Sequence, residues 1–396
     1  MLNLGHGFQM LGVVKMPSLP CSRLQCRVFS QFFRHFSKSR LPVVIADPFN
    51  PNVNEVIDVR SPDEYKEDHI PGAINLPVLS NIERHEVGKL YSEDSFKGRI
   101  YGAQLVTKNI SQIIHDHVTE KPKEYSPLIY CWRGGQRSQS VAIVMAQIGF
   151  NVFVLEKGYK TYKAKVKECL EKLPTQFTFK VLSGPTGSGK THLLSQLSAL
   201  GEQVLDLEGL ANHKGSVLGW DINGSQPSQK WFDSLIVDRL RRFNPDKVVW
   251  MESESVKIGK LHVPSVLHKE MGKSQYFKIT LPLEERIQHI IQIYPDYIEN
   301  FQFTKEQLLK LQKHHSGSRV MDWITLGERQ QWPEFVEALL TEHYDPLYSR
   351  SQRKHFKSHA TEVYLDSLGP EHVQPFLQRL ISCSLSEVKD VGSMSA

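Results

Sequence analysis

Cysteine is scarce in this chain of 396 residues, and its five cysteines are scattered along the sequence. No CxxC pair and no cysteine–histidine spacing typical of zinc sites occurs, so the sequence supports neither a disulfide framework nor structural zinc. Apolar runs are short as well, and none approaches the roughly 18 to 20 residues that a membrane-spanning helix needs. We therefore expect no membrane insertion, and the length predicts two or three globular domains.

Acidic residues are absent from positions 1–46, which carry six Lys and Arg residues. Taking these six charges from the net charge of +5 leaves −1, so the rest of the chain is nearly neutral. A basic, Ser-rich N-terminus without acidic residues is typical of organellar transit peptides. We expect residues 1–41 to be a transit peptide or a disordered leader that directs the protein to the mitochondrion, with plastid and cytoplasm as alternatives.

Strand and helix patterns alternate in two regions after the leader. Alternating strands and helices predict α/β domains with parallel sheets. We place a first domain at residues 42–172 and a second at 176–385, and from about Leu283 the second becomes helical and charged. Residues 386–396 are expected to form a disordered tail.

The segment YCWRGGQRS, residues 130–138, places one cysteine in a glycine- and arginine-rich loop between a strand and a helix. Backbone amides and the positive end of a following helix favour the thiolate form of such a cysteine. Cys131 is therefore a candidate nucleophile, and Arg133 and Arg137 are candidate catalytic groups that bind an anion. The other residues of the expected oxyanion loop are Gly134, Gly135, Gln136 and Ser138. The Cys-x5-Arg spacing leaves two interpretations open, chalcogen transfer from a phosphate-bearing donor or phosphatase chemistry.

The segment GPTGSGKT, residues 184–191, fits the pattern G-x-x-x-x-G-K-[ST] between a predicted strand and a predicted helix. In such a loop the backbone amides bind phosphates, the lysine reaches the terminal phosphate and the Ser or Thr hydroxyl binds magnesium. Thr191 is the predicted magnesium ligand. The full set of expected phosphate- or diphosphate-binding residues is Gly184, Thr186, Gly187, Ser188, Gly189, Lys190 and Thr191.

Two further segments concentrate charged side chains near predicted strand ends. DLEGLANHKGS crowds four of them around a glycine-bounded turn, and VVWMESES ends in two glutamates where an ATPase strand would end in aspartate. Carboxylates at a strand end suit magnesium or a positioned water. The candidate second-site residues are Asp206, Glu208, His213, Lys214, Glu252 and Glu254.

Several motifs resemble known families. VIDVRSPDEYKEDHIPGAINLPV and VFVLEKGYKTY resemble the rhodanese domain, whose members carry sulfur or selenium on the loop cysteine. In order along the chain, CWRGGQRS, GPTGSGKT, DLEGLANHKGS, ESESVKIG and HYDPLY resemble the tRNA 2-selenouridine synthase family, although Gln136 stands where that family usually has Met. The resemblance implies an α/β protein with an N-terminal rhodanese-like domain followed by a P-loop NTPase-like domain with a helical C-terminal part.

The resemblance also implies a transferase that converts 2-thiouridine at the tRNA wobble position to 2-selenouridine. The base sulfur would first be alkylated by geranyl diphosphate, and selenium from selenophosphate, carried on Cys131 as a selenenyl sulfide, would then replace the geranylthio group. We expect the diphosphate at the phosphate loop, where a nucleotide is the alternative ligand. If one base visits both sites, both should face one cavity.

Binding to tRNA requires local positive charge, because phosphate contacts dominate affinity. The candidate clusters are Arg239, Arg241 and Arg242, then Lys310 and Lys313, then Arg350, Arg353, Lys354 and Lys357. Other functions remain open from the sequence: geranylation or sulfur transfer without selenium, a P-loop ATPase or kinase with a regulatory rhodanese module, and a rhodanese-fold phosphatase.

Overall fold

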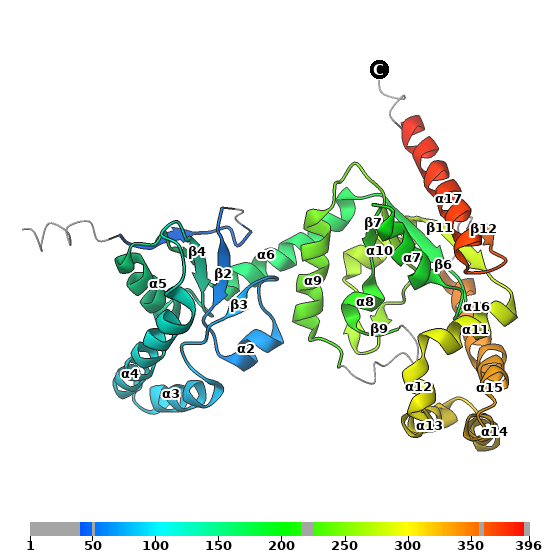
Figure 1. The fold of residues 1–396 in the computed structure, drawn as a ribbon, viewed down its shortest axis with the longest axis horizontal. Helices are drawn as coiled ribbons and strands as arrows, with labels where there is room; N and C mark the ends of the chain where they lie inside the picture. Colours follow the sequence, from blue (N-terminus) through cyan, green and yellow to red (C-terminus); the bar gives the residue numbers. More distant parts are fainter. Residues whose placement is uncertain (1–39, 50–51, 215–224, 356–359, 392–396) are drawn as a thin grey trace, which may run out of the picture.

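Two α/β domains lie side by side along the long axis of the molecule (Figure 1). The structure is a computed structural model and describes residues 40–49, 52–214, 225–355 and 360–391. Residues 1–39 of the expected leader lie outside these ranges. None of the described helices is long and apolar enough to cross a membrane.

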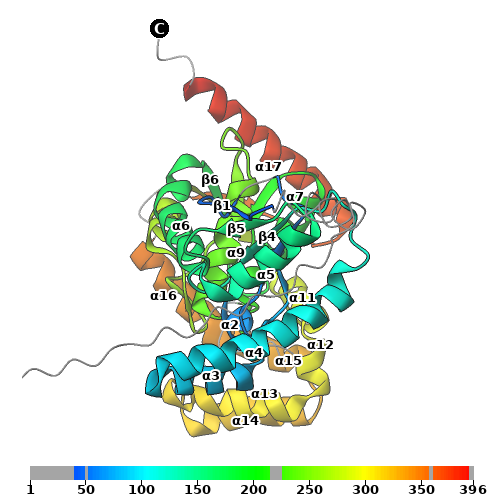
Figure 2. The same ribbon diagram turned by 90° about the vertical axis from the view of Figure 1, so that its left-hand side faces the viewer.

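The first domain is built on a five-stranded parallel sheet in the order β1-β5-β4-β2-β3. Its strands are β1 (Val43–Ile45), β2 (Glu55–Asp58), β3 (Ile74–Asn75), β4 (Pro127–Tyr130) and β5 (Phe153–Leu155). Its helices are α2 (Pro62–Glu67), α3 (Asn81–Glu93), α4 (Ser95–Ile113), the π-helix η1 (Ile114–Val118), α5 (Gln136–Ile148) and α6 (Tyr159–Lys172). Figure 2 views this domain from its outer side, where α3 and α4 cross below α5.

Helices cover both faces of this sheet, which is why strand β4 is buried at every position. Successive side chains of a strand point to opposite faces. Ile129 packs against α4 and α5 in one core, whereas Leu128 and Tyr130 pack against α6 in the other. The cysteine that follows β4 is therefore presented at the carboxyl edge of a fixed central strand.

The second domain is built on another five-stranded parallel sheet, in the order β12-β11-β6-β8-β7. Its strands are β6 (Phe179–Ser183), β7 (Gln203–Leu205), β8 (Val249–Glu252), β11 (Gln275–Thr280) and β12 (Thr361–Tyr364), and a hairpin joins β9 (Lys257–Ile258) to β10 (Leu261–His262). The helices around it are α7 (Lys190–Ala199), α8 (Leu207–Ala211), α9 (Gln229–Arg242) and α10 (Ser265–Lys273). Strands β6 and β8 are neighbours, so the phosphate-loop segment and the glutamates after β8 leave the same edge.

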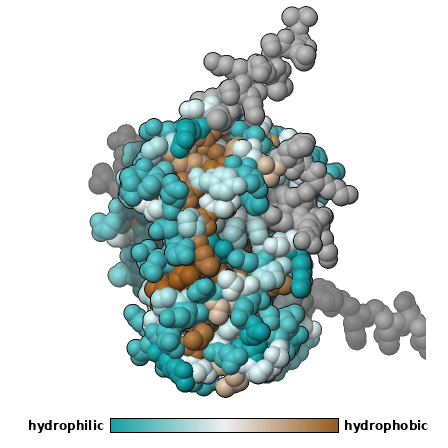
Figure 3. Space-filling view, turned by 90° about the vertical axis from the view of Figure 1, so that its right-hand side faces the viewer, coloured by the Kyte–Doolittle hydropathy of each residue, from teal (hydrophilic) through white to brown (hydrophobic). Residues whose placement is uncertain are grey.

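The chain after β11 is mainly helical, as the sequence predicts. Its elements are α11 (Leu283–Ile293), α12 (Pro295–Glu299), α13 (Phe301–Leu309), the 3-10 helix η3 (Lys310–Lys313), α14 (Gly317–Glu328), α15 (Trp332–Leu339), the π-helix η4 (Leu340–Tyr344), α16 (Asp345–His355) and α17 (Pro370–Val391). Helices α11 to α15 have an apolar core of their own around Trp323 and Leu308. Apolar side chains form a band on this side of the molecule (Figure 3). Helix α17 reaches Val391, so residues 386–391, expected to be a disordered tail, are helical.

The domains meet along α6 and α9, joined through the 3-10 helix η2 (Leu173–Gln176) where the sequence places the boundary. Asp68 of the first domain is buried and accepts hydrogen bonds from Tyr159 at 2.7 Å and from Ser234 of α9 at 2.8 Å. Trp231 of α9 stacks on His69 with a centroid distance of 4.0 Å. The junction thus combines a buried polar contact with ring packing.

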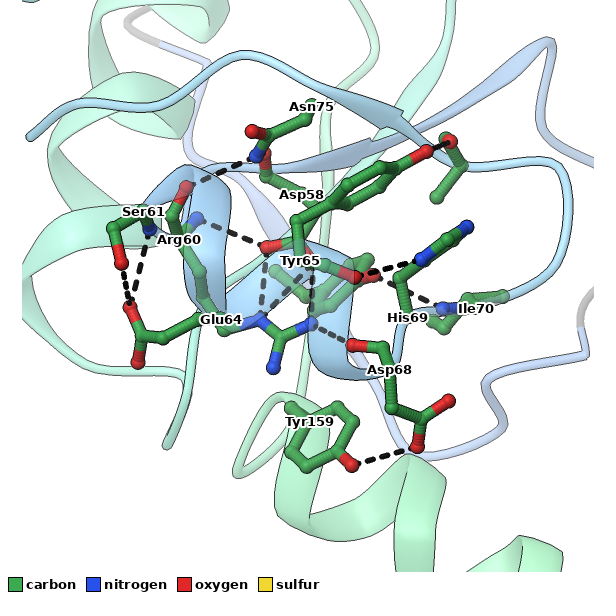
Figure 4. Close-up of polar contacts among 12 residues, drawn as sticks. Asp58, Arg60, Ser61, Glu64, Tyr65, Asp68, His69, Ile70, Asn75 and Tyr159 are labelled. Carbon is green, nitrogen blue, oxygen red and sulfur yellow. Dashed lines mark hydrogen bonds and ion pairs between the residues drawn. The ribbon is translucent and has the colours of Figure 1, made fainter. Parts of the chain in front are cut away.

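A buried ion pair organises the first domain beside this junction (Figure 4). The Arg60 guanidinium binds the Asp58 carboxylate at 2.6 Å, and both side chains are at most 1% exposed. Arg60 also donates to the Asp68 carbonyl at 2.6 Å and lies 4.2 Å from the Tyr159 ring centroid. Burial alone would lower the pKa of Arg60, but the Asp58 carboxylate raises it. Asn75 donates to the carbonyls of Asp58 and Arg60, which ties β3 to the same point.

Replacing Arg60 by methionine should destabilise the first domain by about 3–5 kcal/mol, because it leaves the Asp58 carboxylate buried without a counter-charge. The expected result is a lower urea midpoint for the unfolding of this domain, followed by circular dichroism. Arg99→Met is the matched control, since Arg99 is exposed on α4. Equal midpoints for the two variants would show that the buried pair adds no stability.

Candidate functional site

The cysteine loop is held against the start of α6. Gly158 has φ of 55°, and a Cβ atom there would lie 2.1 Å from the Cys131 carbonyl oxygen, so only glycine fits. The Cys131 carbonyl accepts a hydrogen bond from the Tyr159 amide at 2.8 Å. Trp132 stacks on Tyr159 with a centroid distance of 5.1 Å. The segment EKGY, part of the motif VFVLEKGYKTY, therefore fixes the backbone that carries the cysteine.

The Cys131 side chain lies inside its loop and is 3% exposed. The Ser138 hydroxyl, which is fully buried, donates to Cys131 Sγ at 3.3 Å. Ser138 belongs to the first turn of α5, so the sulfur lies at the N-terminal end of that helix. A hydroxyl donor and a helix N-terminus both stabilise negative charge on sulfur, which is what a nucleophilic cysteine requires.

The two predicted arginines of this loop have different surroundings. Arg137 is half-buried and binds the Glu64 carboxylate through two hydrogen bonds of 2.6 and 3.2 Å. Burial alone would raise the pKa of Glu64, but the hydrogen bonds and charge of Arg137 lower it. Arg133 is exposed at the surface of the loop. Arg137 thus braces the loop against α2, and Arg133 is the arginine accessible to an incoming anion.

The phosphate loop joins β6 to α7, as the sequence predicts. Gly187 has φ of 82°, and a Cβ atom there would lie 2.9 Å from Ile290 of α11, so the loop and that helix require glycine at their contact. Lys190 donates to the carbonyl oxygens of Gly184 and Pro185 at 2.9 and 3.3 Å. The ammonium group is therefore held over the loop, where a bound phosphate would lie.

Three predicted glutamates meet beside this loop. Oxygens of Glu208, Glu252 and Glu254 lie within 4.8 Å of one another, an arrangement that could hold a metal ion. The Thr191 hydroxyl donates to Glu208 at 3.3 Å and to Glu252 at 3.5 Å. Burial, with repulsion between neighbouring carboxylates, raises the pKa of all three glutamates. A divalent cation would relieve this repulsion, and four oxygen donors suit magnesium.

The other predicted second-site residues differ in their roles. The Asp206 carboxylate caps α8 by accepting from the Gly209 amide at 2.7 Å. His213 is buried. Lys214 donates to the Ile293 carbonyl at 2.8 Å, and its ammonium lies 4.1 Å from the Tyr294 ring centroid.

A cavity of about 1010 Å³ contains most of these groups. Its lining includes the phosphate loop, Glu208 and Glu254, and the imidazoles of His192 and His289. Burial, with the neighbouring positive groups, lowers the pKa of His289 to about 4. All of its lining residues belong to the second domain, so the cysteine loop does not line this cavity.

Arg286 of α11 is a site residue that the sequence did not reveal. It donates through Nε to the Thr186 carbonyl of the phosphate loop at 3.0 Å, and its other two nitrogens bind the Asp345 carboxylate at 2.6 and 3.0 Å. Asp345 lies in the motif HYDPLY, which gives that late motif a structural role. The sequence signal that could have revealed this contact is the motif HYDPLY itself, which lies far along the chain from the phosphate loop and had no assigned function.

Comparison with known proteins agrees with this geometry. The rhodanese-like domain model matches residues 44–165, and the tRNA 2-selenouridine synthase AAA domain model matches residues 177–322. The tRNA 2-selenouridine synthase of Sulfurovum sp. is 29% identical over 348 residues, which cover 79% of this chain and 94% of that protein. The tRNA 2-selenouridine synthase of Marinobacter nauticus is 31% identical over 340 residues, which cover 76% of this chain and 90% of that protein. The α/β architecture and the resemblance read from the motifs are both confirmed, and the chain belongs to the tRNA 2-selenouridine synthase family.

Proposed function

We propose that this protein converts 2-thiouridine at the wobble position of tRNA to 2-selenouridine through an S-geranyl intermediate. The observation that carries the proposal is the presence, in one chain, of a sheltered loop cysteine and a phosphate loop beside a carboxylate cluster. The first suits a chalcogen carrier and the second suits a diphosphate ester. Membership of the family, whose named relatives are tRNA 2-selenouridine synthases, supports the assignment.

The first step is S-alkylation of the thiouracil ring. The 2-thio sulfur forms a bond to C1 of the geranyl group while the C1–O bond breaks, and the electron pair of that bond leaves with diphosphate. The ring loses its N3 proton, so the product is neutral. Lys190 and the amides of the phosphate loop stabilise the negative charge that develops on the leaving diphosphate. Alkylation turns a poor leaving group into a good one.

The second step replaces the geranylthio group. The Cys131 thiolate attacks the selenium of selenophosphate and forms an S–Se bond. The Se–P bond breaks and its electron pair leaves with phosphorus as phosphite, so Cys131 carries the selenium as a selenenyl sulfide. The exposed Arg133 binds the phosphate group of the donor. The carried selenium, as an anion, bonds to C2 of the ring as the C2–S bond breaks, and geranylthiol leaves after taking up a proton. A thiol reductant then attacks the Cys131 sulfur, and the S–Se bond breaks with its electron pair going to selenium, which stays on the base. A second thiol frees Cys131 as the reductant forms a disulfide. The Ser138 hydroxyl supports the sulfur in its anionic state before and after transfer.

Magnesium fits the cluster formed by Thr191, Glu208, Glu252 and Glu254, because all four offer oxygen ligands. When bound there, it would neutralise negative charge on a diphosphate. Glu252 is fully buried behind the cavity lining, so it would orient the cluster from the protein side. A nucleotide could use the same groups, which keeps an ATPase or kinase with a regulatory rhodanese module as the second candidate.

The Lys and Arg side chains of the predicted tRNA-contact clusters differ in their exposure and in whether they already contact other protein groups. The Arg241 guanidinium lies 3.4 Å from the Phe49 ring centroid at the domain junction, and Arg242 pairs with Asp238 at 3.0 Å. Lys310 donates to Gln307. Arg350 is exposed on α16, whereas the side chains of Arg353, Lys354 and Lys357 lie outside the described residues. Arg239 and Lys313 are exposed as well, so these two residues and Arg350 are the better candidates among the predicted residues for phosphate contacts.

Replacing Cys131 by serine should abolish selenium incorporation while leaving geranylation intact, because serine cannot carry selenium. The protein is incubated with 2-thiouridine tRNA, magnesium, geranyl diphosphate, selenophosphate and a thiol reductant, and digested nucleosides are identified by mass spectrometry. Cys169→Ser is the control, since Cys169 lies half-buried on α6. Selenouridine formed at the normal rate by Cys131→Ser would rule out the carrier role.

Replacing Lys190 by alanine should slow geranylation by about a hundredfold, because the diphosphate loses a charged donor as it departs. The same nucleoside assay without selenophosphate isolates this step. Lys269→Ala, an exposed lysine on α10, is the control. If geranylation proceeds unchanged in Lys190→Ala and the protein instead hydrolyses ATP in a manner that requires Lys190, the second candidate replaces the first.

Magnesium affinity should fall as the pH falls, because the raised pKa values of Glu208, Glu252 and Glu254 mean that protons compete with the cation. Calorimetric titration with magnesium in two buffers of different ionisation enthalpy should show protons released on binding. Glu254→Gln should weaken binding, and Glu270→Gln on α10 should not. Proton-independent binding would contradict a site at this cluster.

A further inference from the structure

A second, smaller cavity adjoins the large one. It encloses about 70 Å³ between α11, α12, α13, α15 and η4. Three residues line both cavities: Thr186 of the phosphate loop, Ile290 of α11, and Tyr294. The smaller cavity therefore lies next to the place where the phosphates of a ligand would be bound.

The lining of this smaller cavity is apolar almost throughout. Helix α11 contributes Ile290 and Ile291, and α15 contributes Trp332, Phe335 and Val336. The hydroxyl of Thr304, one of the few polar groups in the wall, is already satisfied because it donates to the Tyr297 carbonyl at 2.7 Å. The wall thus offers few hydrogen-bond partners to a water molecule. Transfer of an apolar group from solvent into the cavity would therefore be favourable in free energy.

The orientation of this cavity relative to the phosphate loop is fixed from two sides. Arg286 ties α11 to the Thr186 carbonyl and to Asp345, and Gly187 brings the loop into direct contact with Ile290. Helix α15 contributes no residue to the large cavity, so its side chains form the end of the smaller cavity away from the phosphates. There Trp332 and Phe335 pack edge-to-face with Phe301, at centroid distances of 5.6 and 5.9 Å.

We propose that this smaller cavity receives the hydrocarbon tail of the diphosphate whose head lies in the phosphate loop, and that Trp332 and Phe335 limit the length of that tail. The inference rests on the proposed function for the diphosphate and adds a tail site with its specificity-determining residues. A ligand with an anionic head and an apolar tail matches both compartments at once.

The size of the cavity sets the expected tail length. A water-sized group needs roughly 10–15 Å³ of cavity volume, so this cavity of about 70 Å³ has room for roughly five to seven carbon-sized groups. That corresponds to one isoprene unit. In a ten-carbon tail the outer unit fills the cavity, and the inner unit lies at the mouth against Ile290 and Tyr294. A fifteen-carbon tail would meet the rings of Trp332 and Phe335.

The test measures how diphosphates of different tail length bind to the full chain. Inorganic pyrophosphate and the five-, ten- and fifteen-carbon isoprenyl diphosphates are titrated calorimetrically in magnesium. We expect the ten-carbon compound to bind about tenfold or more tighter than the five-carbon one, and the fifteen-carbon compound to bind no tighter than the ten-carbon one. Equal affinity for pyrophosphate and the ten-carbon compound would overturn the proposal.

Two variants locate the tail. Val336→Phe fills the cavity and should remove the tail-dependent gain while pyrophosphate binding stays unchanged, and Trp332→Ala should shift the preference toward fifteen carbons. Glu337→Phe is the matched control, because Glu337 is exposed on the same helix. Thermal unfolding identifies a variant that fails to fold. A tail-dependent gain that survives in folded Val336→Phe would place the tail elsewhere and overturn the proposal.

The same measurements separate this inference from the proposed function. The cavity variants could change the preferred tail length as expected while the tRNA gains neither geranyl nor selenium. In that case the proposed function fails and the tail site stands. If tRNA is modified with no preference among tails, the tail site fails and the proposed function stands.

Discussion

The ion pair between Asp58 and Arg60 is the contact on which most of the first domain's functional geometry depends. Two opposite charges are removed from water together, and each is satisfied by further hydrogen bonds, so the pair tolerates little displacement. Arg60 reaches the ring of Tyr159, whose amide holds the Cys131 carbonyl and whose hydroxyl binds Asp68. The position of the cysteine and the contact with the second domain therefore share one buried support.

The carboxylate cluster beside the phosphate loop concentrates charge of one sign instead of pairing it. Glu208, Glu252 and Glu254 crowd together where burial already disfavours the ionised form. Such an arrangement stores unfavourable energy until a proton or a cation enters it. The Lys190 ammonium donates hydrogen bonds to two carbonyl oxygens of its own loop. A bound phosphate would replace these contacts. The site is thus arranged for a ligand that brings negative charge together with a divalent cation.

The sequence predicted features that depend on short stretches of chain. The loop before α5 and the loop before α7 were located because glycines, a cysteine or a lysine, and the flanking strands occur together. Partners distant in sequence were not predicted. Arg137 with Glu64, and Arg286 with Asp345, are 73 and 59 residues apart, and no local pattern links them. The expected disordered tail begins at residue 386, whereas α17 continues to Val391.

The contact between the domains limits how far each can be treated as a separate module. Val237 of α9 belongs to the apolar core of the first domain, beside Tyr162, and Asp68 finds one of its partners in Ser234. Severing the chain at the boundary would uncover an apolar patch and deprive a buried carboxylate of a donor. A chimera that combines one domain of this protein with the other domain of a distant relative would therefore fold correctly only if α6 and α9 came from the same protein. The two domains are therefore coupled by this contact, whatever distance separates their candidate sites.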